Sequence, residues 1–183
     1  MSAARYIRPW HGRVYRHLPG SSPFGPLDTR FARRSHEQHW SQPGEPTLYL
    51  ALDRAILAND FDRHLRRDRS PAVEEIMQTR RIFAFEIALE RVYDLTDPAS
   101  FGALGITGAP ACFRERAIAR ATAGFLRDVI GVEAMLAPSS DTGSRILILF
   151  LDRLESPLSD IAHSIEAVGS FRLVPATPSP EPS

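Results

Sequence analysis

The chain has 183 residues, and its 22 basic and 22 acidic side chains give a formal net charge of zero. This length fits one domain with a sizeable core, and the balanced charge excludes a global field that would attract nucleic acid or an anionic membrane. Every basic residue is an arginine, which excludes Schiff-base lysine chemistry and a P-loop lysine.

Cysteine usage and hydropathy indicate the compartment. The one cysteine, Cys112, excludes an internal disulfide and a cysteine-based metal cluster. No apolar run reaches transmembrane length, and residues 1–9 lack the apolar core of a signal peptide. We therefore expect a cytoplasmic protein that uses no metal.

The N-terminal region combines an extended segment with a long loop. Residues 12–18 have strand-like composition and carry Arg16, whereas residues 19–42 are rich in Gly, Pro, Ser and Arg. Long loops in compact domains are usually functional or disordered. The arginines of this loop, which include Arg30, are either solvated or suited to gripping a diphosphate.

A turn, a strand and a helix follow, and together they are suited to lining a ligand pocket. The turn formers Pro43, Gly44 and Pro46 precede a strand over residues 47–52. Asp53 is suited to cap a helix that runs to about residue 65. Two sets of side chains share neighbouring faces of this helix, namely Leu57, Phe61 and Leu65 on one and Asp53, Ile56, Asp60 and His64 on the other.

Alternating and fourfold patterns define the middle of the chain. Residues 71–78 suit a short helix, and residues 81–95 alternate apolar and polar side chains as a half-buried strand does. Residues 111–130 predict a helix that Gly131 terminates. Its apolar residues at fourfold spacing are Phe113, Ala117, Ala121, Phe125 and Val129.

The C-terminal region predicts a hairpin, a helix and a tail. Strands over residues 132–137 and 145–151 flank a polar turn that contains Ser139. Residues 156–171 are expected to form a helix, and residues 175–183, rich in Pro and Ser, to be disordered.

The order of these segments resembles that of the RES domain, a family named for Arg, Glu and Ser. Its early Arg matches Arg16, and its turn and strand match Trp40, Pro43, Gly44, Pro46 and Tyr49. Asp60 and His64 stand where family members carry a Glu and a His one helical turn apart. A Val-x-Asp-Leu-Thr-like phrase at residues 92–97 and a Pro-Ser turn at residues 138–141 complete the series.

The resemblance implies an α+β fold like that of the ADP-ribosyltransferase toxins, with a mixed central sheet and flanking helices. It places a RES-like domain at residues 12–154, followed at residues 155–183 by a C-terminal helix and the tail. It also implies cleavage of the nicotinamide–ribose bond of NAD, by phosphorolysis or hydrolysis. The family's toxins are neutralised by a helix-turn-helix antitoxin of the Xre type.

The resemblance assigns roles to seven residues. Arg16 is expected to bind the phosphates and Ser139 to make a polar contact with the ligand. Asp60 is expected near the ribose, because a carboxylate there stabilises oxocarbenium charge. Tyr49, Trp40, His39 and Arg30 are expected to line the NAD site, with Tyr49 stacked on nicotinamide.

Two positions depart from the family. Asp60 is one methylene shorter than the family Glu, and His39 stands in place of an Arg. Arg30, Arg33 and Arg34 are the candidates to replace that Arg, and residues 28–31 also resemble the family phrase, although the register on Trp40 aligns more residues. The alternative is therefore a weakened RES-like domain that binds a nucleotide or a protein without turnover. A third reading is transfer of ADP-ribose to a protein. The acceptor, and the choice between a monomer and a homodimer, stay open.

Overall fold

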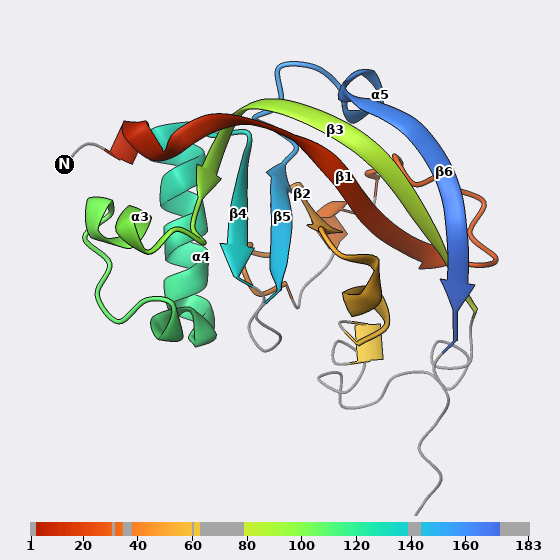
Figure 1. The fold of residues 1–183 in the computed structure, drawn as a ribbon, viewed down its shortest axis with the longest axis horizontal. Helices are drawn as coiled ribbons and strands as arrows, with labels where there is room; N and C mark the ends of the chain where they lie inside the picture. The colour runs from red at the N-terminus through yellow and green to blue at the C-terminus, as the bar shows by residue number, and fades with distance from the viewer. Residues whose placement is uncertain are drawn as a thin grey trace, which may run out of the picture.

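One six-stranded sheet organises the chain in the computed structural model (Figure 1). The structure describes residues 3–30, 32–34, 38–59, 61–62, 79–138 and 144–172. The strands are β1 (Ile7–Pro19), β2 (Thr47–Ala51), β3 (Arg80–Asp94), β4 (Ala134–Pro138), β5 (Arg145–Phe150) and β6 (Ala162–Phe171). The α-helices are α3 (Pro98–Ala103), α4 (Arg116–Phe125) and α5 (Leu158–Ile161). Shorter helical turns are η1 (Ala3–Tyr6), η2 (Ala32–Arg34), η3 (Arg54–Ile56), η4 (Ala111–Arg114) and the π-helical η5 (Leu126–Ile130).

The sheet closes on itself. Its strand order is β1-β2-β5-β4-β3-β6, and β1 also pairs with β3, so five strands form a ring to which β6 is attached. The β3–β4 pair is parallel and the other pairs are antiparallel. The predictions of a single compact domain and of a mixed sheet are thus confirmed.

The long strand β3 is the shared wall of this arrangement. It pairs with β1 along nearly its whole length, with β6 at residues 80–87 and with β4 at residues 92–94. Its register with β1 shifts between Arg8 and Trp10. There the buried carboxylate of Glu133 accepts hydrogen bonds from the backbone amides of Glu90 and Arg91, at 2.8 and 2.9 Å. A side chain therefore satisfies amides that the irregular ladder leaves unpaired.

Hydrophobic side chains cover both faces of the sheet. Leu48 and Leu50 of β2 join Val14 in one core cluster, whereas Tyr49 packs against a second cluster that α4 contributes to. Successive strand residues point to opposite faces. Arg16, two residues after Val14, therefore projects from the face opposite to that of Tyr49.

The predicted strands over residues 47–52, 81–95 and 145–151 are confirmed, as is the Asp53 cap. The Asp53 carboxylate accepts from the amide of Ala55 at 2.8 Å. The helix predicted over residues 156–171 is wrong, because α5 is a single turn and residues 162–171 form β6. Pairing with β3 supplies this strand's hydrogen bonds, and its exposure on both faces removes the alternation that marks a strand.

The helix predicted over residues 111–130 is present as η4, α4 and η5. Gly131 ends it with φ of 75°, a left-handed conformation that favours glycine. The buried face, however, is Ala119, Thr122, Ala123 and Leu126. Of the residues at fourfold spacing only Phe113 is buried, and Ala117, Ala121, Phe125 and Val129 face outward.

Several predictions lie outside the described residues. These concern the helix at residues 71–78, the tail at residues 175–183, and Asp60, His64 and Ser139. Among the helices of the described part, none has the length and apolar character needed to cross a bilayer.

Candidate functional site

Arg16 anchors the loop that follows β1. Its Nη1 donates to the backbone carbonyls of Pro26 and, at 2.9 Å, of Asp28. Burial lowers the pKa of Arg16, and the nearby Asp28 charge opposes that shift. Since a guanidinium nevertheless stays charged, Arg16 brings a partly buried cation to the base of this loop.

Asp28 also receives Arg30. The Arg30 guanidinium contacts the Asp28 carboxylate through Nε at 2.9 Å and through Nη2 at 2.5 Å, and its backbone amide donates to the same carboxylate. Hydrogen bonds from Arg30 lower the pKa of Asp28. The Arg30 guanidinium lies 4.3 Å from the centroid of the Phe24 ring. Because the Arg30 side chain is 68% exposed, water screens the pair, and a competing anion can displace the carboxylate at low cost.

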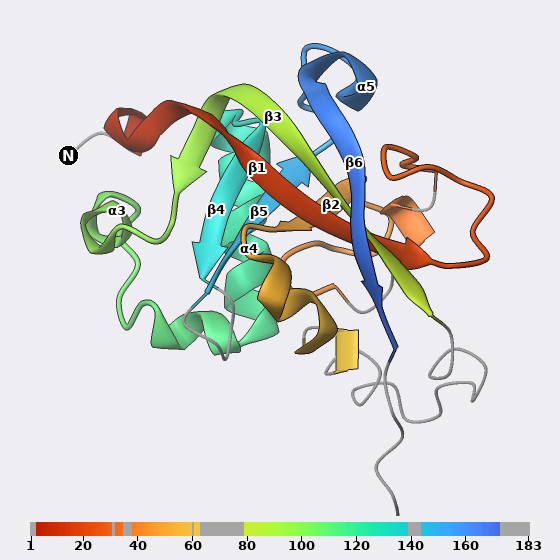
Figure 2. The ribbon, with the colours of Figure 1, turned by 45° about the vertical axis from the view of Figure 1, so that its right-hand side comes forward.

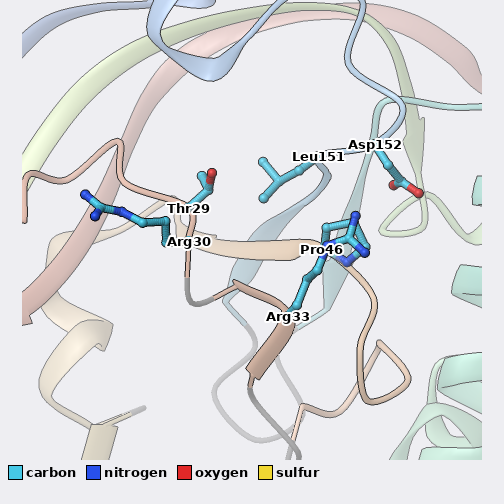
Figure 3. Close-up of a pocket in the computed structure, with 6 residues that line it drawn as sticks. All are labelled: Thr29, Arg30, Arg33, Pro46, Leu151 and Asp152. Atoms are coloured by element: carbon cyan, nitrogen blue, oxygen red, sulfur yellow. The ribbon is translucent and has the colours of Figure 1, made fainter.

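A cavity of about 270 Å³ lies beside this loop. It is lined by Thr29, Arg30, Arg33, Pro46, Leu151 and Asp152. In Figure 3 the Arg33 side chain extends toward Pro46, whereas that of Arg30 extends away from Leu151 and Asp152. The cavity therefore joins the arginine-rich loop to the start of β2 and the end of β5, and its size suits part of a dinucleotide.

The acidic wall of the cavity is held by Arg127 of η5. Its guanidinium contacts Asp152 at 2.5 Å and Glu45 at 2.9 Å, and its side chain is 14% exposed. Burial acts to raise the pKa of Asp152, but the hydrogen bond and charge of Arg127 outweigh it and lower the pKa. Arg127 thus ties η5 to the chain before β2 and after β5.

Tyr49 holds the turn that precedes its own strand. Its hydroxyl oxygen accepts the backbone N–H of Trp40 at 2.9 Å and lies 3.3 Å from the hydroxyl of Ser41. Burial raises the pKa of Tyr49 to about 12. The Ser41 hydroxyl in turn donates to the side-chain oxygen of Gln38. The hydroxyl of Tyr49 is therefore engaged by the fold, and its side chain packs against the core cluster on the α4 side of the sheet.

His39 and Trp40 connect the same turn to the helical region. Trp40 is 3% exposed and its ring lies 5.1 Å from that of Phe113. His39 Nε2 is 2.6 Å from the carbonyl oxygen of Phe113. Arg120 of α4 donates to the carbonyl of Gln38 at 2.7 Å. These contacts make the turn a rigid support for Tyr49.

The structure therefore sorts the described candidates into two groups. Arg16 and Arg30 meet at the loop after β1, whereas His39, Trp40 and Tyr49 gather on the α4 side of the sheet. The roles of all seven residues remain predictions, and Asp60 and Ser139 lie outside the described part. Sequence reasoning missed Asp28, Arg127 and Asp152, although the Asp-Thr-Arg phrase at residues 28–30 was a local signal for the first.

Comparisons with known proteins find a solved structure with a similar fold. No protein-family model matches the chain, and no curated protein matches its sequence. Its structure is similar to a chain in the crystal structure of the M. tuberculosis MbcT-MbcA toxin–antitoxin complex, with a TM-score of 0.62 and 20% sequence identity. The similarity covers 94% of this chain and 90% of that chain. The chain thus shares its fold with a component of a toxin–antitoxin complex.

Proposed function

We propose that the chain is a RES-like enzyme that cleaves the nicotinamide–ribose bond of NAD and acts as the toxin of a toxin–antitoxin pair. The observation that carries the proposal is the fold similarity, over 94% of the chain, to a component of the MbcT-MbcA toxin–antitoxin complex. The RES-like phrases around Arg16, Tyr49 and residues 92–97 add support from the sequence. An ADP-ribosyltransferase-like site is part of the same proposal.

The chemistry assigned to the residues follows from the bond that breaks. Loss of nicotinamide leaves positive charge on the ribose, which the carboxylate of Asp60 would stabilise. Arg30 would bind the NAD diphosphate after releasing Asp28. The contact of the Tyr49 ring with nicotinamide that the RES resemblance implies would need a ligand that reaches both groups of residues. Ser139 would hydrogen-bond the ligand. Arg16 would act on the phosphates, directly or through the loop that it anchors.

The partner proposed for this chain is an antitoxin encoded as a separate protein. The support is again the similar chain, whose crystal structure is of a toxin–antitoxin complex. An Xre-type helix-turn-helix protein is the antitoxin class that the RES resemblance implies. Co-expression of such a protein should restore growth to cells that the toxin arrests.

The direct test is to incubate the purified protein with NAD, with and without inorganic phosphate, and to follow nicotinamide release. Release that requires phosphate identifies a phosphorylase, and release in both conditions identifies a glycohydrolase. No release from the folded protein in either condition would refute NAD cleavage. Labelled NAD in a cell extract tests protein modification in parallel.

A matched pair of variants tests the arginine assignment. Arg30→Ala is expected to raise the KM for NAD about tenfold or more, because a charge-assisted bidentate contact is lost. Arg8→Ala is the control, since Arg8 is also exposed, at 60%, and also faces an aspartate, Asp97 at 3.7 Å. An equal effect of both substitutions would reject a specific role for Arg30.

The second candidate function is binding without turnover. It is favoured by Asp60 in place of the family Glu and by the engagement of Arg30 with Asp28. Asp60→Glu separates the two functions, because a displacement of about 1 Å in a catalytic group changes rates on the order of 100-fold. A large gain in NAD cleavage from an inactive parent supports a weakened site. Unchanged inactivity favours a binding domain.

A further inference from the structure

A cluster of aromatic and basic side chains lies where β1 ends, β3 begins and β6 ends. Figure 2 shows these three strand ends close together, and Arg80 of β3 pairs with Phe171 of β6. The ring of His17 on β1 lies 5.3 Å from that of Phe171, centroid to centroid. Phe61, which follows β2 in the chain, packs on the same face, with its ring 5.1 Å from His17 and 5.9 Å from Phe171. Three strands and the chain after β2 therefore meet at one cluster.

The centre of this cluster is a hydrogen bond between two basic side chains. Arg80 Nε donates to His17 Nδ1 at 2.7 Å, and Arg80 is only 9% exposed. A guanidinium offers donors and no acceptor, so Nδ1 must carry a lone pair and the imidazole must be neutral, with its proton on Nε2. The same guanidinium lies 4.2 Å from the centroid of the Phe61 ring, a cation–π contact. The neutral ring of His17 thus holds a buried cation against Phe61.

Protonation of His17 at Nδ1 would remove this contact. The new N–H would face the N–H of Arg80, and two positive charges would meet where little water can reach them. Besides Arg80, the charged groups on the elements around the ring are Arg54, Asp62, Arg81 and Arg172. All of these except Asp62 are arginines, so most of the surrounding charge also opposes a cationic ring. Histidine is the side chain that ordinarily changes its charge between about pH 5 and 8.

We infer that His17 is a positioning residue for the proposed NAD cleavage, and that its protonation releases Phe61 and lowers turnover in acid. Phe61 directly follows Asp60, the carboxylate proposed to act on the ribose, and consecutive Cα atoms are about 3.8 Å apart. A clamp on Phe61 therefore restricts the chain beside that carboxylate, and its release costs rate. The effect on turnover rests on the proposed function, whereas the clamp is a property of the fold.

His17→Asn tests the role of protonation, because the Asn side-chain oxygen stands as many bonds from Cα as Nδ1 does and accepts from Arg80 without titrating. In the wild type, kcat for nicotinamide release should fall about tenfold or more between about pH 7.5 and about pH 5.5, with KM little changed. His17→Asn should lose this dependence. Carboxyl groups of ordinary pKa, about 4, are charged throughout this range and would not cause such a fall.

Two further variants separate titration from packing. His17→Phe keeps an aromatic ring but has no acceptor for Arg80, so it should show near neutral pH the low kcat that the wild type shows in acid. His11→Asn is the matched control, since His11 is an exposed histidine on the same strand, and it should keep the wild-type profile. A fall in kcat in acid that His17→Asn retains, or that His11→Asn abolishes, overturns the inference.

Hydrogen exchange tests the clamp without NAD. Protection factors of peptides that contain Phe61 should be lower at about pH 5.5 than at about pH 7.5 in the wild type, and equal at the two values in His17→Asn. Equal protection in the wild type overturns the inference. A wild type that releases no nicotinamide at any pH refutes the proposed function instead, and the exchange result then decides the clamp alone.

Discussion

Arg16 and Arg30 meet at Asp28 from two sides, Arg16 through the backbone carbonyl at 2.9 Å and Arg30 through the carboxylate. The contact of Arg16 is partly buried, and that of Arg30 is exposed. One arginine therefore fixes the loop, and the other is presented by it.

Arg16→Gln should loosen residues 24–30 and lower NAD turnover about tenfold or more, because a misplaced binding group costs rate steeply. Hydrogen exchange of the loop is the measurement for the first effect. Arg8→Gln, at an exposed arginine, should change neither exchange in the loop nor turnover. Unchanged exchange in Arg16→Gln would contradict the anchoring role.

Asp28→Asn should lower the KM for NAD by about two- to fivefold, because an exposed ion pair holds its partner only weakly. The amide oxygen can still accept the backbone N–H of Arg30, so the turn is kept while the guanidinium is released. Steady-state kinetics measure the effect. The same change in an Arg30→Ala background should have no effect, and a decrease in KM there would count against competition by Asp28.

Tyr49→Phe should lower the free energy of unfolding by about 1–3 kcal/mol, since it leaves the buried Trp40 amide without its acceptor. Burial raises the pKa of Tyr49 from 10.0 to about 12, so the folded protein holds the phenol proton more tightly. The resulting stability is present below pH 10 and is lost as the pH rises toward 12. Denaturation at alkaline pH should show a smaller loss in Tyr49→Phe than in the wild type. Burial also raises the pKa of Tyr93, so the alkaline denaturation of Tyr93→Phe should be measured for comparison.

Tyr49→Leu should abolish most NAD turnover, whereas Tyr49→Phe should retain it in the folded protein, because stacking needs the ring and not the hydroxyl. The ratio of kcat/KM between the two variants is the measurement. Equal losses would indicate that Tyr49 acts through the turn that it supports.

Asp152→Asn should flatten the acid side of the stability profile. The pKa of folded Asp152 lies below its ordinary value of 3.8, so its contribution is present above that pH and is lost as the pH falls through the folded pKa. Melting temperatures between about pH 3 and 7 should therefore differ most at neutral pH and converge in acid. Asp160→Asn, at an exposed position of α5, is the control variant.

Sequence reasoning was most successful where a pattern reflects burial on one face. The alternation of Phe83, Phe85 and Ile87 marks β3, and Asp53 caps the turn after β2 as expected. It failed at β6, where Ser164 has a φ of 53° and both faces are exposed. It also missed the buried face of α4. Because alanines occur on several faces of this helix, their spacing does not indicate which face packs into the core.

The sequence predicts individual residues of the candidate site but not how they come together in the fold. The phrase around Trp40 and Tyr49 predicts a support for a ligand, yet the hydrogen bond that joins them depends on the turn's three-dimensional path. The ion pairs of Arg127 were harder to predict. Its partners Glu45 and Asp152 lie far away in sequence and come together only when the ring of strands closes.

The carboxylate of Glu133 lies where β3 changes its neighbour from β6 to β4. Because this side chain satisfies the amides of Glu90 and Arg91, the strand can leave β6 and continue beside β4 without exposing backbone groups. Replacement of Glu133 would therefore leave the amides of Glu90 and Arg91 without their acceptor at the corner where β3 passes from β6 to β4. A single acidic side chain thus completes the backbone hydrogen bonding of the strand that two different neighbours share.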